Sequence, residues 1–394
     1  MTELHNDPKM DAPGIGRTGL PKRDYLVLPL ISLLTILVIF GAAEILTRLI
    51  WPEQTANPCL IEDPAAGDRF KPNCTSRTKI AEGPWTIDHY NDCGYRSATS
   101  CESKPKGSLR IGILGSSMSE ALHVPYEQAF FSLTIKELSH ECGRRVDVQD
   151  LGVQGSSPIY AYRRVGEILA LKPDVVLYLI APYDVQQQII PKELVERDQP
   201  TRTSSTAAAA AKLSPLNHLE RMVLQSRSVL VAQHYIFQNK INFIRVYMMY
   251  GDKADFLRQP FTPAWHQRFA DLDLIIGDMA DKVHSAGIPL IVIPVPSRAE
   301  AALLTSQQMS PSVDPFAFGR EVERIASKHG ADFVDLMEPF SQIADSENLY
   351  FVVDGHVNTD GQKVIAAALL RKLQDGSVPV FSHCDLRQSA ERGH

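Results

Sequence analysis

From Leu109 onward the chain alternates between short apolar runs, which predict buried strands, and longer segments with the apolar spacing of helices. The predicted strands are 109–114, 146–151, 174–180, 289–294 and 332–336, and the predicted helices cover about 126–142, 158–171, 265–286 and 361–373. Strands that are apolar on both faces and separated by helices form parallel sheets covered on both sides. The predicted fold class is therefore α/β, with a five-stranded parallel sheet and helices on both faces.

A glycine and two serines, Gly115, Ser116 and Ser117, follow the first predicted strand. We predict a tight turn into a helix at this point. A serine there projects from the carboxyl edge of the sheet, where open α/β folds bind ligands. The helix behind it would offer free N–H groups to a developing oxyanion. Ser117 is thus a candidate nucleophile, and the alternative is a turn followed by a helix N-cap with no chemistry.

A second polar group, Asp354-Gly-His356-Val-Asn358, lies between the fifth predicted strand and the last predicted helix. We expect it at the same edge of the sheet as Ser117. A carboxylate on one ring nitrogen fixes the tautomer of a histidine, and the other nitrogen can then accept a serine proton. We predict that Ser117, His356 and Asp354 form a catalytic triad. The alternative is a capping loop in which Asp354 and Asn358 only bind backbone donors.

These blocks resemble those of the SGNH (GDSL-type) hydrolase family in a single-pass membrane-anchored form. Residues 115–121 are similar to the family's Gly-Asp-Ser-Phe-Thr-Glu-Gly block, 151–155 to its second block and 354–358 to its fifth, while Ala181-Pro-Tyr-Asp184 takes the place of the third block, Gly-x-Asn-Asp. Residues 91–96, Asn-Asp-Cys-Gly-Tyr-Arg, are similar to an entry motif of anchored members. The resemblance implies a three-layer flavodoxin-like fold and ester hydrolysis or acyl transfer. It also implies an oxyanion hole at Ser117, Gly155 and position 183.

The chain departs from the family pattern at three points. Ser116 replaces the aspartate before the nucleophile, Tyr183 replaces the asparagine of the third block, and one residue rather than two separates Asp354 from His356. Losing one oxyanion donor costs about 2.7–4 kcal/mol of transition-state stabilisation, although the Tyr183 hydroxyl is a substitute donor. A catalytically degenerate binding or assembly protein is therefore an alternative to an enzyme.

An uncharged apolar run from Tyr25 to Ala43 follows a polar leader, residues 1–24, that carries four cationic side chains and that we expect to be disordered. The run matches the length of about 20 residues that a helix needs to span a bilayer, and Trp51 suits the far interface. We predict an anchor over residues 25–50, with the N-terminus cytoplasmic and the rest periplasmic at a bacterial inner membrane. A cleaved signal peptide, with Gly-Ala-Ala as its cleavage site, is the alternative.

The six cysteines favour disulfides, because both export interpretations place them in an oxidising compartment. Proximity in the chain predicts the pairs Cys59–Cys74 and Cys93–Cys101, and scattered buried thiols are the alternative. No cysteine pair has the spacing of a zinc site, so we expect neither a metal nor a cofactor. A net charge of −6 gives no reason to expect a nucleic-acid partner.

The predicted organisation is a leader (1–24), an anchor (25–50), a cysteine-containing extension (51–108), a hydrolase-like domain (109–380) and a tail (381–394). A mostly helical insertion, residues 186–264, interrupts the domain beside the site and either lines an acyl or glycan groove or forms its own core. The leading hypothesis is a membrane-anchored periplasmic serine esterase that removes O-acyl groups from envelope or exported carbohydrate. An O-acyltransferase with the same triad and a lipid esterase are further alternatives.

Overall fold

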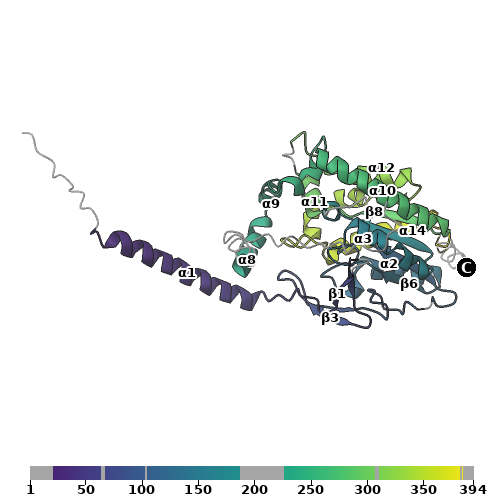
Figure 1. The fold of residues 1–394 in the computed structure, drawn as a ribbon, viewed down its shortest axis with the longest axis horizontal. Coiled ribbons are helices and arrows are strands. Elements are labelled where there is room, and N and C mark those ends of the chain that lie inside the picture. The colour runs from purple at the N-terminus through teal and green to yellow at the C-terminus, as the bar shows by residue number, and fades with distance from the viewer. Residues whose placement is uncertain are drawn as a thin grey trace, which may run out of the picture.

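A computed structural model describes residues 21–63, 67–102, 104–186, 226–306, 310–381 and 384. Most of the predicted leader, most of the tail and residues 187–225 of the predicted insertion lie outside these residues. A long helix, α1 (Asp24–Ile50), precedes a domain in which a parallel sheet is sandwiched between helices (Figure 1). Within the described chain, α1 is the helix that is long and apolar enough to cross a membrane, and none of its residues is buried.

Five parallel strands form the central sheet in the order β6-β5-β7-β8-β9. Their bounds are β5 (Leu109–Leu114), β6 (Val146–Asp150), β7 (Val175–Ile180), β8 (Leu290–Pro294) and β9 (Asp332–Phe333). The second strand in the chain lies outside the first, which is the flavodoxin-like order, and the order reverses between β5 and β7. The prediction of a five-stranded parallel α/β sheet is confirmed. The fifth strand is shorter than the predicted 332–336.

Helices cover both faces of the sheet. Every residue of β7 is buried, and its successive side chains point to opposite faces, so apolar side chains need cover on each side. Val176, Tyr178 and Ile180 pack with α3, α4, α10 and α12, whereas Val175, Leu177 and Leu179 pack with α2 and α14. The bounds of these helices are α2 (Phe130–Cys142), α3 (Pro158–Arg163), α4 (Val165–Ala170), α10 (Pro263–Ser285), α12 (Ala317–Lys328) and α14 (Thr359–Gln374). The predicted helix over 158–171 is thus divided at Arg164.

Shorter helices lie at the edges of this sandwich. They are η1 (Tyr126–Gln128), α5 (Pro182–Gln186), α8 (Arg227–Phe237), α9 (Lys240–Tyr247), η2 (Gly251–Lys253), η3 (Asp255–Leu257), α11 (Arg298–Leu304), α13 (Met337–Ser341) and η4 (Ser346–Leu349). The described part of the predicted insertion is helical, as expected. Figure 1 shows α8 beside the carboxyl end of α1, on the side of the domain from which α1 emerges.

The predicted extension folds as two small antiparallel ribbons. One pairs β1 (Leu60–Asp63) with β2 (Gly67–Phe70), and the other pairs β3 (Thr75–Thr78) with β4 (Thr86–His89). Strand β4 thus pairs with the strand before it, and after β4 the chain forms only an isolated bridge between residues 90 and 96. His89 is exposed and bonded to Thr75.

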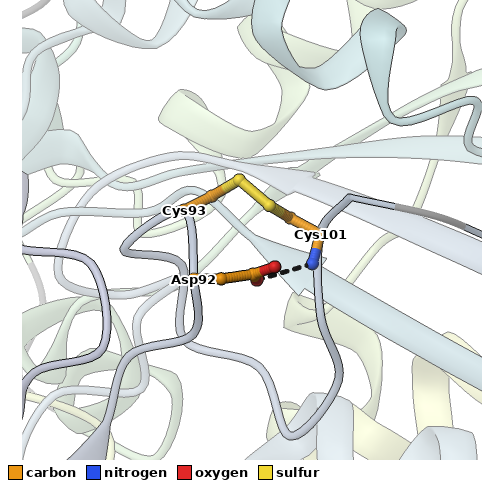
Figure 2. Close-up of side chains that lie close together, drawn as sticks. All are labelled: Asp92, Cys93 and Cys101. Atoms are coloured by element: carbon orange, nitrogen blue, oxygen red, sulfur yellow. Dashed lines mark hydrogen bonds between the residues drawn. A yellow bond between two sulfur atoms is a disulfide. The ribbon is translucent and has the colours of Figure 1, made fainter.

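All six cysteines form disulfides in the described chain. Cys59–Cys74 and Cys93–Cys101 confirm the two predicted pairs, and Cys142–Cys384 links the end of α2 to the C-terminal region. Asp92 lies beside the Cys93–Cys101 bridge and accepts a hydrogen bond from the Cys101 N–H at 2.8 Å (Figure 2). Both sulfurs are bonded to each other, so this cluster has no thiolate to offer a metal.

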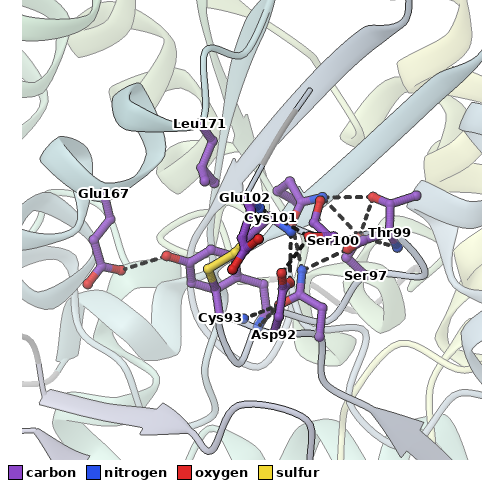
Figure 3. The surroundings of a disulfide bond; sticks show 12 residues. Asp92, Cys93, Ser97, Thr99, Ser100, Cys101, Glu102, Glu167 and Leu171 are labelled. Atoms are coloured by element: carbon purple, nitrogen blue, oxygen red, sulfur yellow. Dashed lines mark hydrogen bonds between the residues drawn. A yellow bond between two sulfur atoms is a disulfide. The ribbon is translucent and has the colours of Figure 1, made fainter. Parts of the chain in front are cut away.

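The Cys93–Cys101 bridge closes the loop that carries the predicted entry motif. Figure 3 shows the polar network around it. The Asn91 carboxamide oxygen accepts the N–H groups of Cys93 and Tyr95, and its NH₂ group donates to Gln149 on β6 at 2.9 Å. Gly94 has φ +80°, and a Cβ there would lie 2.0 Å from the Phe70 carbonyl oxygen. Only glycine fits this turn, which fastens the extension to the edge strand of the sheet.

We predict that Gly94→Ala destabilises the protein several times more than Gly107→Ala. Both glycines have φ near +80°, but a Cβ at Gly107 meets nothing within 4 Å. The Gly107 variant therefore loses only the left-handed strain, about 1 kcal/mol, while the Gly94 variant must also displace backbone. Thermal unfolding of the full chain in detergent measures both. An equal loss of thermal stability in the two variants would show that the Asn91–Arg96 loop is not fixed as described.

Candidate active site

Ser117 lies in the turn that follows β5, at the carboxyl edge of the sheet. Gly115 allows the turn, because its φ is +153° and a Cβ there would lie 2.7 Å from the Leu179 carbonyl oxygen. The predicted helix after Ser117 is wrong: residues 117–122 form turns, and the next regular α-helix begins at Phe130. Left-handed backbone at Ala121 (φ +52°) and His123 (φ +67°) prevents helix continuation. A helix dipole therefore does not act on Ser117.

The structure brings Ser117, His356 and Asp354 together in one line of hydrogen bonds. The Ser117 Oγ lies 2.7 Å from His356 Nε2, and His356 Nδ1 lies 2.7 Å from Asp354 Oδ1. The serine is separated from the other two residues by more than two hundred positions in the chain. The contact arises because β5 ends at the same edge of the sheet as the loop before α14. This is the arrangement of a nucleophile, a base and a group that orients the base.

The loop that carries Asp354 and His356 is held by bonds on both sides. Gly355 has φ +83°, which lets the two flanking side chains turn toward each other. The Glu82 carboxylate, from the extension, accepts the backbone N–H groups of Val353 and Asp354 at 2.9 and 3.0 Å. After the loop, Asn358 caps α14 by accepting the N–H groups of residues 360 and 361. Capping thus falls to Asn358, while Asp354 faces the imidazole.

Burial and charge act in opposite directions on this site. Burial lowers the pKa of His356, but the Asp354 carboxylate and, more weakly, the Asp184 carboxylate raise it, and the net shift is upward. Burial raises the pKa of Asp354, but His356 and His123 together lower it by more. The net shift is downward, so Asp354 stays ionised. Burial also raises the pKa of Asp184 to about 6, against a hydrogen bond from Ser116. Where the family pattern has an aspartate, Ser116 therefore supplies no carboxylate, and its hydroxyl instead donates a hydrogen bond to the carboxylate of Asp184.

The N–H groups of Ser117 and Gly155, which the family resemblance assigns to an oxyanion hole, donate to no other protein atom within the described residues. Both therefore remain available for that proposed role. The loop of Gly155 is held by Glu120, whose carboxylate accepts the Gln154 N–H at 2.9 Å. Tyr183, on α5, is 60% exposed. Its role as the third donor stays a prediction.

His123 is a neighbour of the triad that the sequence patterns did not single out. Its Nε2 lies 3.6 Å from Asp354 Oδ2, a distance at which charges interact but a hydrogen bond does not form. Its ring is 8% exposed, and its Nδ1 has no partner among the described residues. A positive φ is uncommon outside glycine, although histidine adopts it more often than most residues. That local signal is visible only once the backbone is known.

A cleft of about 260 Å³ opens beside the triad. Its lining includes His123, Asp354, His356, Glu82 and Gln154. A larger hollow of about 450 Å³ lies at the amino ends of β7 and β8, against Pro173 and Pro289. Ligands of open α/β sheets bind at the carboxyl ends of the strands. The smaller cleft is therefore the relevant one.

A second cluster of described residues, besides Asp92 with Cys93 and Cys101, has the spacing of metal ligands. A ring nitrogen of His123, a ring nitrogen of His356 and an Asp354 oxygen lie within 4.8 Å of one another. Both ring nitrogens of His356 are already engaged, by Asp354 and by Ser117. A metal at this point would compete with the hydrogen bonds of the triad.

No known protein-family model matches the sequence. A stretch of 99 residues is 32% identical to an uncharacterized protein from Leptospira interrogans, and it spans 25% of this chain and 17% of that protein. Solved structures with a similar arrangement include TesA (14% identity, 68% of this chain and 98% of that chain, TM-score 0.38). They also include a lipase/acylhydrolase from Enterococcus faecalis (12% identity, 68% of this chain and 96% of that chain, TM-score 0.36). The esterase EstA from Pseudoalteromonas is similar to the same degree (12% identity, 68% of this chain and 97% of that chain, TM-score 0.36).

We predict that His123→Gly slows the reaction of Ser117 with a fluorophosphonate between about two- and fivefold. Asp354 loses the imidazole whose Nε2 lies 3.6 Å from its Oδ2, whereas the left-handed backbone is kept without strain. Ala121→Gly relaxes the same loop without touching Asp354, and its rate should match wild type. Equal slowing in both variants would mean that loop rigidity, and not the imidazole, affects the serine.

Proposed function

We propose that this protein is a serine hydrolase of the SGNH type that acts on acyl esters. The observation that carries the proposal is the line of hydrogen bonds from Ser117 through His356 to Asp354. A protein that kept the fold for binding alone has no need of this line, and its cleft could be filled by a substituted side chain. Tyr183 is not among the residues that line the cleft, and it is mostly exposed. The geometry therefore supports an enzyme over a binding module.

In the proposed reaction, the Ser117 oxygen attacks the ester carbonyl and its proton moves to His356 Nε2. The carbonyl oxygen becomes an oxyanion, which the N–H groups of Ser117 and Gly155 bind. When the tetrahedral intermediate collapses, the bond to the alcohol oxygen breaks and His356 returns the proton to it. Water, deprotonated by His356, then releases the acid and regenerates Ser117. Asp354 keeps its negative charge and orients the imidazole throughout.

We also propose that α1 anchors the protein in a bacterial inner membrane, with the triad on the periplasmic side. The apolar length of α1 and the three disulfides support this location. An O-acyl group on an envelope or exported carbohydrate is the proposed substrate class. A sugar hydroxyl in place of water would turn the same steps into acyl transfer, and analysis of the products distinguishes the two.

We expect the full chain, in detergent, to be labelled by a fluorophosphonate at Ser117. Labelling should disappear in Ser117→Ala and fall sharply in His356→Ala, because the serine then has no base. Ser116→Ala is the matched control: its hydroxyl binds Asp184, so labelling should persist. Folded wild-type protein that resists the probe would argue against the proposal, as would label that remains in Ser117→Ala.

The labelling rate should rise with pH through a midpoint above 6.5, the ordinary pKa of histidine. Only neutral His356 can accept the proton, and its pKa is shifted upward by Asp354. Asp354→Asn removes the negative charge, so the midpoint of the residual rate should move to lower pH while the rate falls by about 10⁴-fold. Rates measured from pH 5 to 9 test both statements. A wild-type midpoint below 6.5 would contradict the role given to Asp354.

A further inference from the structure

The segment from α8 through the residues after α9, Arg227–Tyr250, exposes large apolar side chains, and we call it the α8–α9 segment. At least 46% of each of these side chains is exposed: Tyr235, Ile236, Ile241, Met249 and Tyr250. Clustered exposed apolar side chains mark surfaces that meet a partner or a membrane. The position of this segment in the fold indicates whether it meets a partner protein or a membrane.

The N-terminus of α8 is bonded to α1 through one carboxylate. Glu44 accepts the Ser226 hydroxyl at 2.7 Å and the backbone N–H groups of Arg227 and Ser228 at 2.9 Å each. These N–H groups have no partner within α8, and a carboxylate at a helix N-terminus is electrostatically favourable. Thr47, one turn further along α1, lies 3.3 Å from the Ser228 hydroxyl. The start of α8 is thus fixed beside Glu44.

Glu44 also sets the depth of α8 relative to the bilayer that α1 is proposed to cross. It is the first charged residue after the apolar run that begins at Tyr25. At about 1.5 Å per residue, Glu44 lies about 30 Å along the axis from Asp24, which is about the thickness of the hydrocarbon core. Glu44 therefore falls at the boundary between hydrocarbon and headgroups, and α8 begins at the same depth.

Aromatic side chains at this level fit a membrane interface. Trp51, directly after α1, contacts His234 with ring centroids 4.8 Å apart and Tyr235 with centroids 6.3 Å apart. Tyrosine and tryptophan are enriched at the headgroup level. The exposed side chains of Tyr235 and Ile236 belong to the same helix, whose N-terminus is held at Glu44. A second copy of the chain would have to approach this segment past the lipid headgroups.

The cleft beside the triad is built from the same elements. Leu230 of α8 lines it, together with Glu53 and Thr55 from the chain that follows α1. Thr55 can lie at most about 18 Å from Ile50, even along fully extended chain. His234 of α8 bonds Glu82 at 2.7 Å, and Glu82 in turn accepts the Asp354 N–H. The cleft therefore opens close to the membrane surface.

We propose that the α8–α9 segment lies in the headgroup layer of the bilayer that α1 crosses, and that the cleft takes acyl esters held in that bilayer. The substrate class is amphipathic: an ester on a lipid, or on a glycan joined to a lipid. This inference depends on the anchor and the esterase activity proposed above. It adds the surface from which the substrate arrives.

The first test places a photoreactive p-benzoylphenylalanine at Tyr235 of the full chain in vesicles of phosphatidylethanolamine and phosphatidylglycerol. The control carries the same group at Leu274, which is 56% exposed and belongs to α10. Figure 1 shows α10 on the far side of the domain from α1. We expect lipid adducts, detected by mass, at position 235 and at least tenfold fewer at 274. Equal adducts at both positions, or a covalent protein dimer at 235, would overturn the proposal.

The second test compares two esters: a long-chain ester in the vesicles and a water-soluble acetyl ester. Tyr235→Ser combined with Ile236→Ser should lower kcat/KM for the vesicle ester about tenfold and leave the soluble ester unchanged. Leu274→Ser should change neither, and equal losses on both esters would count against membrane docking. Fluorophosphonate labelling of the same samples separates the two proposals. Label without lipid adducts refutes the docking alone, and adducts without label refute the esterase alone.

Discussion

The buried guanidinium of Arg96 is the interaction on which the arrangement of the site depends. Arg96 is 1% exposed and pairs with Asp88 on β4. It also donates to the backbone carbonyls of Glu120, Ala121 and Val124, which belong to the loop after Ser117. Its two terminal nitrogens make all of these bonds, while its buried Nε has no partner among the described residues. Because a buried charge that loses its partners is strongly destabilising, these bonds constrain the groups that accept them. The bonds of Arg96 therefore hold the extension and the nucleophile loop in one arrangement, including the irregular backbone at Ala121 and His123.

A second residue of the extension supports the other half of the triad. Glu82 accepts the N–H groups of Val353 and Asp354 and binds His234 of α8. Removing Glu82 would leave those N–H groups without partners and would free the loop that orients His356. Residues 51–108 are therefore more than a spacer between α1 and the sheet, because they position both the serine and its base. The same bonds connect the triad loop, through α8 and Glu44, to the proposed anchor.

The sequence alone predicted the features that depend on local chemistry. Strand β7 is apolar at every position, so its burial on both faces and its parallel pairing follow from composition. Ser117, Asp354 and His356 could be proposed as partners because their residue types suit one proton transfer and their blocks follow strands of one sheet. The pairs Cys59–Cys74 and Cys93–Cys101 are close in the chain, with separations of 15 and 8 residues. In these cases the information lies within short blocks of neighbouring residues, even where two blocks are far apart in the chain.

The tertiary structure decided what distant residues do to one another. The turn after Ser117 replaces the predicted helix because Arg96 binds carbonyls that a helix would use internally. Cys142–Cys384 spans 242 residues, and no spacing rule links its ends. His123 and Glu82 showed no motif, since their roles arise only where the Asp354 loop meets them. Tyr183, on α5, is mostly exposed, and its part at the oxyanion stays a prediction. Local patterns specify elements and candidate chemistry, whereas desolvation and packing between remote segments determine which side chains reach the site.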